Sequence, residues 1–183
     1  LAPSHPEFPH GGNTRAILER YPEATMLAPA YGETHELYHF DRSTKVAPGD
    51  TLDLGSHHVE FVEPVFMDHY MHNWLYESTR DVLFCVDWFG FPHQDDECER
   101  FVDEIDTRVT VARLKTHPTN PFHWFRYADP AETDRAIDGV IEEYGDVTLA
   151  PTHGLVIRED AVRYMEAYKE VVRATATDAS VVG

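Results

Sequence analysis

The chain has 183 residues, 42% of them hydrophobic, which is enough for one domain with a core of its own. Its 33 acidic residues outnumber 15 Lys plus Arg, and the formal net charge of −18 disfavours binding to nucleic acid or to an anionic membrane surface. No stretch reaches the roughly 20 apolar residues of a membrane span, and Cys85 and Cys98 are too few for a disulfide framework.

Composition also indicates the environment in which the protein works. Cys85 lies in an apolar run where a buried thiol is expected, and no signal peptide is visible, so a reducing cytoplasm is favoured. Lysine is scarce and acidic residues are spread over the whole chain, a pattern typical of proteins that stay soluble at high salt. We therefore predict a cytoplasmic, halophilic protein.

The first informative stretch is His5-Pro-Glu-Phe-Pro-His10, which two glycines follow. Its two prolines interrupt a helix, so we predict an extended turn with His5 and Glu7 on one side and His10 directed toward a neighbouring position. This arrangement excludes the helical zinc-protease pattern, which needs His at i and i+4. It suits two adjacent metals, with an ordinary proline-rich loop as the alternative.

The next segments predict an α/β layer. A short helix is expected over residues 15 to 20 and a buried strand over residues 25 to 28, so that turn, helix and strand follow in order. Residues 31 to 43 are polar and undecided, and we expect His35 and His39 to face solvent.

A β-hairpin is predicted farther along the chain. The strands 51 to 54 and 57 to 62 flank Gly55-Ser56, which suits a two-residue turn. The loop Asp68-His69-Tyr-Met-His72 then leads into a strand over residues 73 to 76.

The apolar run Val82 to Val86 predicts a strand that ends at Asp87. A carboxylate at the end of a buried strand costs free energy unless it is paired or bound to a metal. Asp87 is therefore a second candidate ligand, and a loop-capping aspartate is the alternative.

The region after this strand carries weaker signals. Residues 94 to 105 are acidic and compatible with a helix, whereas Pro118 and Pro121 predict breaks between residues 107 and 125. The histidines of this region are expected to be structural or exposed; they are His93, His117 and His123.

Asp129-Pro130-Ala131-Glu132 is a strong helix start, because Asp suits the cap and Pro the first helical position. Gly145 is expected to end this helix. Its predicted apolar stripe comprises Ala136, Ile137, Val140, Ile141 and Tyr144.

The last segments repeat the pattern of a ligand after a strand. Residues 146 to 150 form a predicted strand that runs into Pro151-Thr-His153-Gly154. A final amphipathic helix follows, with residues 175 to 183 as a disordered tail. Its expected buried stripe is Ala161, Met165, Tyr168 and Val172.

Ligand-type residues thus occur at four separate strand ends, and loops of this kind carry function on a rigid scaffold. The patterns His5-x-Glu7-x-Pro9-His10-x-Gly12, Leu83-Phe-Cys-Val-Asp87-Trp-Phe-Gly90 and Pro151-Thr-His153-Gly154 resemble the metallo-β-lactamase fold. With Glu7 at the second position, they resemble more narrowly the oxygen- and nitric-oxide-reducing diiron domain of flavodiiron proteins. The resemblance implies an α/β, metallo-β-lactamase-like αββα sandwich over residues 1 to 174, incomplete at its amino terminus.

The resemblance also implies a set of metal ligands. His5, Glu7 and a middle-loop histidine would hold the first metal, and Asp87 would bridge to the second. His10 and His153 would complete the second site. For the middle loop, His69 fits the family spacing best, with Asp68 and His72 as alternatives.

Pro9 departs from the family pattern, which has a metal-ligating aspartate at this position. Proline offers no ligand atom, so the second metal site should be weak or empty. In hydrolases of the same superfamily this aspartate orients the attacking water, so its loss also counts against hydrolysis.

These observations predict a flavodiiron-like oxidoreductase that acts on oxygen or nitric oxide. Imidazole and carboxylate ligands favour iron and leave zinc open. FMN would have to come from a partner chain or a missing domain, because no phosphate-binding loop is present. The alternative functions are a metal-dependent hydrolase of esters and a non-catalytic sensor. An exposed sheet edge would favour pairing of two copies into a homo-oligomer.

Overall fold

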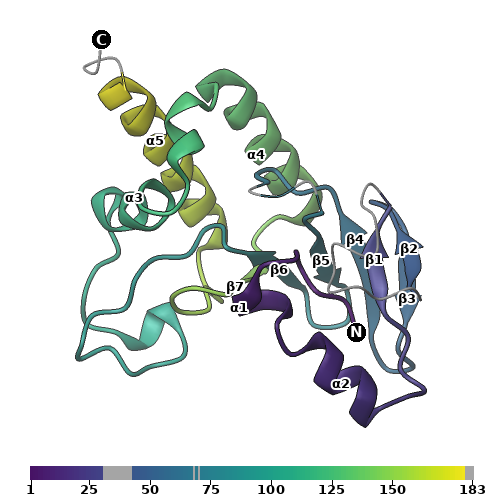
Figure 1. Cartoon of the computed structure of the whole chain (residues 1–183). Coiled ribbons are helices and arrows are strands. Elements are labelled where there is room, and N and C mark those ends of the chain that lie inside the picture. The colour runs from purple at the N-terminus through teal and green to yellow at the C-terminus, as the bar shows by residue number, and fades with distance from the viewer. Residues whose placement is uncertain (31–42, 68, 70, 180–183) are drawn as a thin grey trace. The chain divides into compact units, whose positions relative to one another are not determined.

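The structure, a computed structural model, describes residues 1–30, 43–67, 69 and 71–179 (Figure 1). It divides into two compact units, Leu1–Arg80 and Asp81–Gly183, which are described separately below. The predictions for His35, His39 and Asp68 fall outside the described residues. None of the described helices has the length and apolar character needed to cross a membrane.

The described residues of the first unit include two short helices and five short strands. Strands β1 and β2 are parallel, and β3, β4 and β5 form an antiparallel meander. The predicted hairpin is confirmed: Asp53 pairs with His58, and Gly55 has the positive φ of 87° that a tight turn favours. The elements are α1 (Phe8–Gly11), α2 (Thr14–Arg20), β1 (Leu27–Pro29), β2 (Thr44–Val46), β3 (Thr51–Asp53), β4 (His58–Val62) and β5 (Trp74–Glu77).

Two small apolar clusters hold this unit together. In one, Met26 and Ala28 pack with Met71, which brings the β1 segment next to the middle loop. In the other, Leu27 and Val46 of the parallel pair pack on Phe61 of β4. Both clusters thus include a residue of β1, and the predicted strand 25–28 corresponds to β1, which begins two residues and ends one residue later.

The predicted extended turn at the amino terminus is only partly correct. The chain bends over residues 4–7, with Glu7 itself in an extended conformation, and Phe8–Gly11 then forms one turn of helix. Pro9 lies at the start of that turn, where proline is tolerated because the backbone N–H there has no helical partner. His10 is therefore carried by a helix.

The second unit contains a parallel strand pair and a group of helices. Leu83 of β6 pairs with Leu149 of β7, with an irregularity before Val86. Helix α5 packs against α3, α4 and η3. The elements are β6 (Val82–Val86), η2 (Val102–Glu104), α3 (Val111–Thr119), η3 (His123–Tyr127), α4 (Pro130–Tyr144), β7 (Thr148–Pro151) and α5 (Ala161–Ala179).

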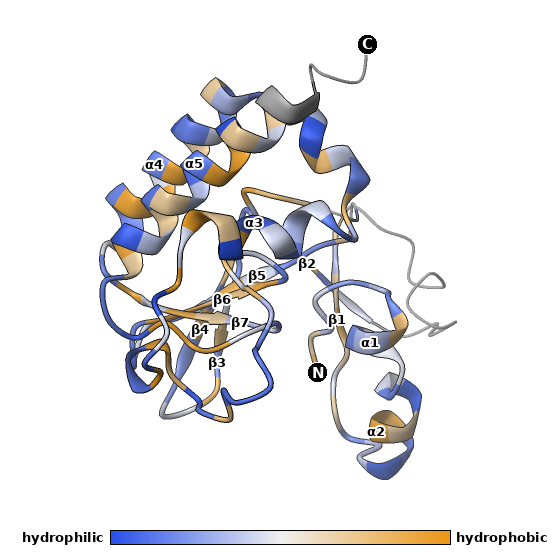
Figure 2. Cartoon of the chain, turned by 90° about the vertical axis from the view of Figure 1, so that its left-hand side faces the viewer, coloured by the Kyte–Doolittle hydropathy of each residue, from blue (hydrophilic) through white to orange (hydrophobic). Residues whose placement is uncertain are grey.

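Aromatic side chains form the centre of this unit. Tyr168 of α5 is fully buried, and its ring lies edge-on to Phe89 at 5.1 Å between centroids. Trp88 stacks on Phe125 of η3 at 5.7 Å, which connects the loop after β6 to the helices. The stripe predicted for the last helix is confirmed, because all four of its residues are buried. Figure 2 shows α4 and α5 with alternating hydrophobic and hydrophilic residues, as expected for helices that each bury one side.

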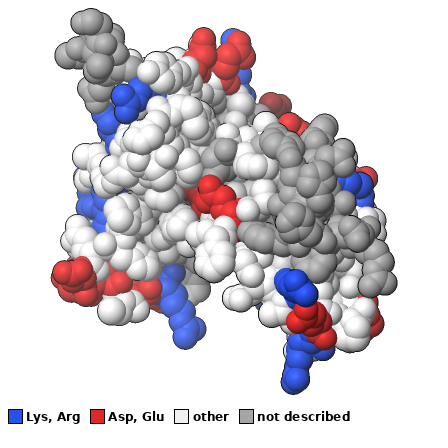
Figure 3. Space-filling view, in the orientation of Figure 1, with Lys and Arg blue, Asp and Glu red and all other residues white. Residues whose placement is uncertain are grey.

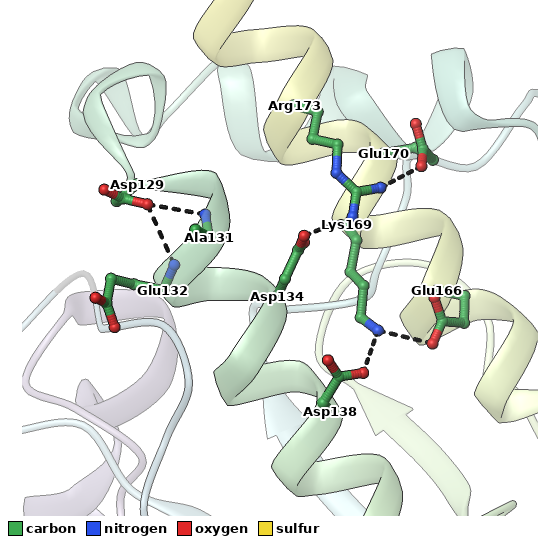
Figure 4. Close-up of polar contacts among 9 residues, drawn as sticks. All are labelled: Asp129, Ala131, Glu132, Asp134, Asp138, Glu166, Lys169, Glu170 and Arg173. Carbon is green, nitrogen blue, oxygen red and sulfur yellow. Dashed lines mark hydrogen bonds and ion pairs between the residues drawn. The ribbon is translucent and has the colours of Figure 1, made fainter.

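The predicted start of α4 is confirmed in detail. The Asp129 side chain accepts hydrogen bonds from the backbone N–H of Ala131 (2.8 Å) and Glu132 (3.2 Å), both shown in Figure 4. The apolar stripe differs at one position, since Ala136 is exposed and Thr133 is buried instead.

Ion pairs join α4 to α5. Lys169 is 5% exposed and donates to Asp138 (2.5 Å) and Glu166 (2.7 Å). Arg173 donates to Asp134 at 2.5 Å on the same side of α4 (Figure 4). One of the chain's few lysines thus neutralises two carboxylates where the helices meet.

Three predictions for this unit need correction. Residues 94 to 105 are mostly irregular, because Glu97 turns inward to bind Arg113 and Gln94 N–H instead of facing solvent on a helix. Helix α3 includes Pro118 in its last turn and ends one residue later, so the break predicted at this proline falls just after it. Helix α5 continues to Ala179, so the tail predicted from residue 175 is helical over its first residues.

Candidate metal centre

Three histidines lie together in the first unit: His5, His10 and His72. The His5 ring is fully buried, its centroid lying 4.1 Å from that of His10 and 4.8 Å from that of His72, with the last pair stacked. Such close imidazoles are typical of metal sites, since two neutral rings can bind one cation. We refer to His5, His10 and His72 as the histidine cluster.

The backbone around Ser4 sets this arrangement. Ser4 O accepts a hydrogen bond from Asn73 N (2.9 Å), which places His72 beside His5. The turn of α1 is closed by His10 N and Gly11 N, which both donate to Glu7 O. Ser4 and Asn73, which are 69 positions apart in sequence, therefore meet through one backbone hydrogen bond.

Two polar side chains lie beside the histidine cluster. Ser4 Oγ is 3.3 Å from Nδ1 of His5 and 3.3 Å from Nδ1 of His10. Glu7 Oε2 is 3.7 Å from Nε2 of His5, and the Glu7 side chain is 56% exposed. The two nitrogen atoms of the His5 ring thus face different groups.

The middle loop places His72, not His69, beside His5. His69 uses its Nδ1 locally, to accept a hydrogen bond from Met71 N (3.0 Å). His72 is buried and stacked on His5. Sequence spacing favoured His69, because spacing carries no information about the backbone hydrogen bond that brings His72 to His5.

In the second unit, Asp87 and His153 lie together with Thr152 and His117, and we call these four residues the Asp87 cluster. Asp87 is 2% exposed, and its Oδ1 lies 3.0 Å from His153 Nε2. Thr152 Oγ1 lies 2.9 Å from Asp87 Oδ1 and 2.9 Å from Val86 O, so its single hydroxyl proton is shared between these two acceptors. The predicted pairing of a buried carboxylate at the end of β6 is therefore present.

His117 was expected to be structural or exposed, yet it contacts this cluster. Its Nε2 donates to Asp87 O (3.0 Å), and its ring centroid is 4.8 Å from that of His153. Burial and the neighbouring His153 lower the pKa of His117. A neutral His117 that donates from Nε2 fits these contacts, and no local sequence signal could have identified it, because α3 is far from β6 in sequence.

The loops that carry Asp87 and His153 are tightly fitted to each other. A Cβ on Gly90 would lie 2.2 Å from His153 O, and one on Gly154 would lie 2.4 Å from Phe91 O. Val86, just before Asp87, has a φ of 55°, which is costly for a β-branched residue. Such strain persists only where surrounding contacts determine the backbone. Here it occurs at the residue directly before the candidate ligand Asp87.

The donors in both clusters are imidazole nitrogens and carboxylate oxygens. Cys85 adds no thiolate, because burial raises the pKa of its thiol and its Sγ donates to Trp88 O (3.1 Å). A nitrogen and oxygen donor set of this kind suits iron, manganese or zinc. The residues therefore fit the metal that the sequence patterns imply.

The sequence is similar to that of a known reductase, although it matches no family model. A nitric oxide reductase of Moorella thermoacetica is 27% identical over 174 residues, which cover 92% of this chain and 42% of the relative. The chain thus spans less than half the length of that protein.

Two solved structures of longer proteins are similar to this chain in fold. The rubredoxin oxygen:oxidoreductase of Desulfovibrio gigas matches 97% of this chain and 43% of its own, with a TM-score of 0.70 and 23% identity. A mutant flavo di-iron protein of Thermotoga maritima matches 93% of this chain and 42% of its own, with a TM-score of 0.71 and 18% identity. The chain therefore has the metallo-β-lactamase-like fold of flavodiiron proteins, as the sequence patterns predicted.

Proposed function

We propose that this chain is the metal-binding domain of an oxidoreductase of the flavodiiron type, which reduces oxygen or nitric oxide. The observation that carries the proposal is that imidazole and carboxylate groups occupy the three sequence patterns of that fold, with His5 and Asp87 buried. The relatives named as a nitric oxide reductase and a rubredoxin oxygen:oxidoreductase support the choice of substrates.

The proposed ligands are those that the sequence patterns imply. The first unit supplies His5, Glu7, His10 and a middle-loop histidine, and the second unit supplies Asp87 and His153. For the middle loop we replace His69, the choice that sequence spacing favoured, with His72, because His72 is buried against His5.

Iron is the metal that we propose, because imidazole and carboxylate ligands suit it and the similar structure from Thermotoga maritima is a flavo di-iron protein. A bound iron would supply the one-electron chemistry that oxygen and nitric oxide require. The residues of this chain would hold that ion, and the Asp87 carboxylate would offset its positive charge. Electrons would come from a flavin on a partner chain or on another part of the protein.

Hydrolysis is the weaker alternative. It requires a carboxylate that orients a metal-bound water, and the position that would provide one is Pro9. Pro9 also weakens the second metal site, so we expect closer to one ion per chain than two.

Metal content tests the proposal. We expect purified protein, reconstituted anaerobically with Fe²⁺, to retain close to one iron per chain and to consume oxygen or nitric oxide when supplied with a chemically reduced flavin. Pro9→Asp should raise the iron content, because it adds a carboxylate, whereas Pro9→Ala should not.

Two outcomes would contradict this proposal. A folded parent protein that retains no iron would remove the assigned metal function. If both Pro9 variants retain as much iron as the parent and none consumes oxygen or nitric oxide, a non-catalytic binding role would replace the reductase.

A further inference from the structure

The Ser4 side chain is shared between two histidines of the histidine cluster. Its Oγ lies at the same distance, 3.3 Å, from Nδ1 of His5 and from Nδ1 of His10. Ser4 is partly buried and precedes His5 directly. One hydroxyl group therefore contacts the same ring atom of two neighbouring imidazoles.

The chemistry of a hydroxyl group restricts what these contacts can be. A serine hydroxyl has one hydrogen to donate and two lone pairs that accept. It can accept from two N–H groups at once, but it can donate to only one nitrogen. Either both rings carry a proton on Nδ1, or one of them does and the other accepts the serine proton.

The geometry points to Ser4 as a positioning residue that accepts Nδ1–H from both rings, so that His5 and His10 each present an unprotonated Nε2 to a cation. This inference rests on the proposed metal-binding function and specifies which atoms would act as ligands. Metal-bound histidines commonly donate their other ring N–H to a nearby acceptor, which fixes the tautomer and the orientation of the ring. Ser4 would serve two ligands in this way.

The position of Glu7 supports the choice of Nε2. Its Oε2 lies 3.7 Å from Nε2 of His5, on the opposite edge of the ring from Ser4. Two ligands of a tetrahedral ion with bonds of about 2.1 Å lie about 3.4 Å apart. The spacing of the oxygen and the nitrogen therefore suits two ligands of a single ion.

The backbone of Ser4 has a separate role, so the contribution of its side chain can be tested alone. Ser4 O accepts from Asn73 N and keeps His72 in place. Ser4→Ala removes the hydroxyl but leaves this backbone hydrogen bond available. Ser4→Thr keeps a hydroxyl with the same capacity to accept, and Ser56→Ala, at an exposed turn residue, is the matched control.

The first measurement is the affinity for Zn²⁺, a redox-inert probe, by competition with a chromophoric chelator. We expect Ser4→Ala to bind about 10- to 100-fold more weakly than the parent, as found when the groups that orient metal-bound histidines are removed. Ser4→Thr and Ser56→Ala should bind like the parent. Equal affinity in Ser4→Ala and the parent would overturn the inference.

The second measurement needs no metal, so it separates this inference from the proposed function. In metal-free protein at pH 8, where free imidazole is neutral, long-range ¹H–¹⁵N spectra should show Nδ1–H for both His5 and His10. In Ser4→Ala the Nε2–H tautomer should gain population. An unprotonated Nδ1 on either ring of the parent would overturn the inference, whereas a parent with both Nδ1–H tautomers and no affinity for zinc would overturn the proposed function alone.

Discussion

In the histidine cluster of the first unit, His10 lies in the short turn of α1 and His5 lies just before it, whereas the Asp87 cluster of the second unit lies at the end of a buried strand. Phe8, inside that turn, is 83% exposed, while Trp88 and Phe89, which follow Asp87, are fully buried. The turn is held by a few hydrogen bonds around Ser4. The loops of the Asp87 cluster are fixed by close backbone contacts at Gly90 and Gly154.

This difference shows two ways of holding similar ligands. In the second unit the surrounding core determines the backbone so strongly that Val86 is kept at a positive φ. In the first unit, polar contacts around Ser4 orient the rings of His5 and His10. Substitutions near Asp87 should therefore affect stability, and those near His5 should mainly affect metal binding.

The largest effect is expected from Gly90→Ala. Its Cβ would lie 2.2 Å from His153 O, so one of the two loops must move. We expect a loss of about 3 kcal/mol or more in the free energy of unfolding, measured by urea denaturation in molar salt. The control is Gly139→Ala on α4, whose Cβ would meet nothing within 4 Å and should stabilise the protein by about 0.5–1 kcal/mol. Equal stability of the two variants would show that the loops are not rigidly fitted.

The next largest effect is a difference in stability between variants of the two proposed carboxylate ligands, Asp87 and Glu7. Asp87→Ala and Glu7→Ala should both lower the iron content sharply. In metal-free protein, Asp87→Ala should also cost about 1–3 kcal/mol, because Thr152 and His153 lose a buried partner. Glu7 is half exposed, and its replacement should change stability by less than about 0.5 kcal/mol. A larger loss in Glu7→Ala than in Asp87→Ala would reverse the proposed difference between the clusters.

Acid stability offers a third comparison, because each unit contains a carboxyl group with a low pKa. Hydrogen bonds from Arg113 lower the pKa of Glu97 to about 2. Burial raises the pKa of Glu77, but hydrogen bonds from Thr79, His57 and Arg80 outweigh it and bring the value to about 2. Each group is charged and stabilising above its usual pKa of 4.5, and this contribution is lost as the pH falls through about 2.

Glu97→Gln should therefore reduce the fall in stability between pH 4.5 and about 2, as measured by chemical unfolding at a series of pH values. Added salt should weaken the contribution of Glu97 more than that of Glu77, because Glu97 faces a guanidinium and Glu77 mainly faces neutral donors. An acid profile of Glu97→Gln identical to that of the parent would contradict the role of this pair.

The smallest and most diffuse effect concerns charge, a property that the two units share. On the face drawn in Figure 3, acidic and basic side chains occur in separate small groups, with no single continuous patch. With a net charge of −18, the folded protein repels itself unless salt screens the charges. Screening lengths fall from about 10 Å at 0.1 M to about 3 Å at 1 M salt. We expect the Tm to rise from low to molar potassium chloride, and a flat response would refute the predicted adaptation to high salt.

Elements with local signals were predicted well from the sequence. The start of α4 depends on Asp129 and Pro130, and the hairpin depends on Gly55, so a few neighbouring residues determine each. The position of Asp87 at the end of β6 follows from five apolar residues before it. Such features need no knowledge of the rest of the chain.

Features that depend on distant contacts were missed. His117 contacts Asp87 across 30 positions, and His72 reaches His5 because Asn73 N bonds to Ser4 O. The acidic stretch that contains Glu97 was expected to be helical, but pairing with Arg113 fixes a turn instead. In each case a partner far along the chain decides the outcome, and neither periodicity nor spacing contains that information.

The burial of two tryptophans has a practical consequence for spectroscopy. Trp74 lies two residues after His72 and Trp88 directly follows Asp87, and both indoles are fully buried. Indole emission depends on the polarity and rigidity of the surroundings, so each unit carries its own optical reporter beside its candidate ligands. Two double variants isolate the two reporters. Trp124→Phe with Trp74→Phe keeps only Trp88, which reports on the second unit, and Trp124→Phe with Trp88→Phe keeps only Trp74, which reports on the first. Titration of these two proteins with metal would follow each half of the ligand set separately and show whether the two respond at the same metal concentration.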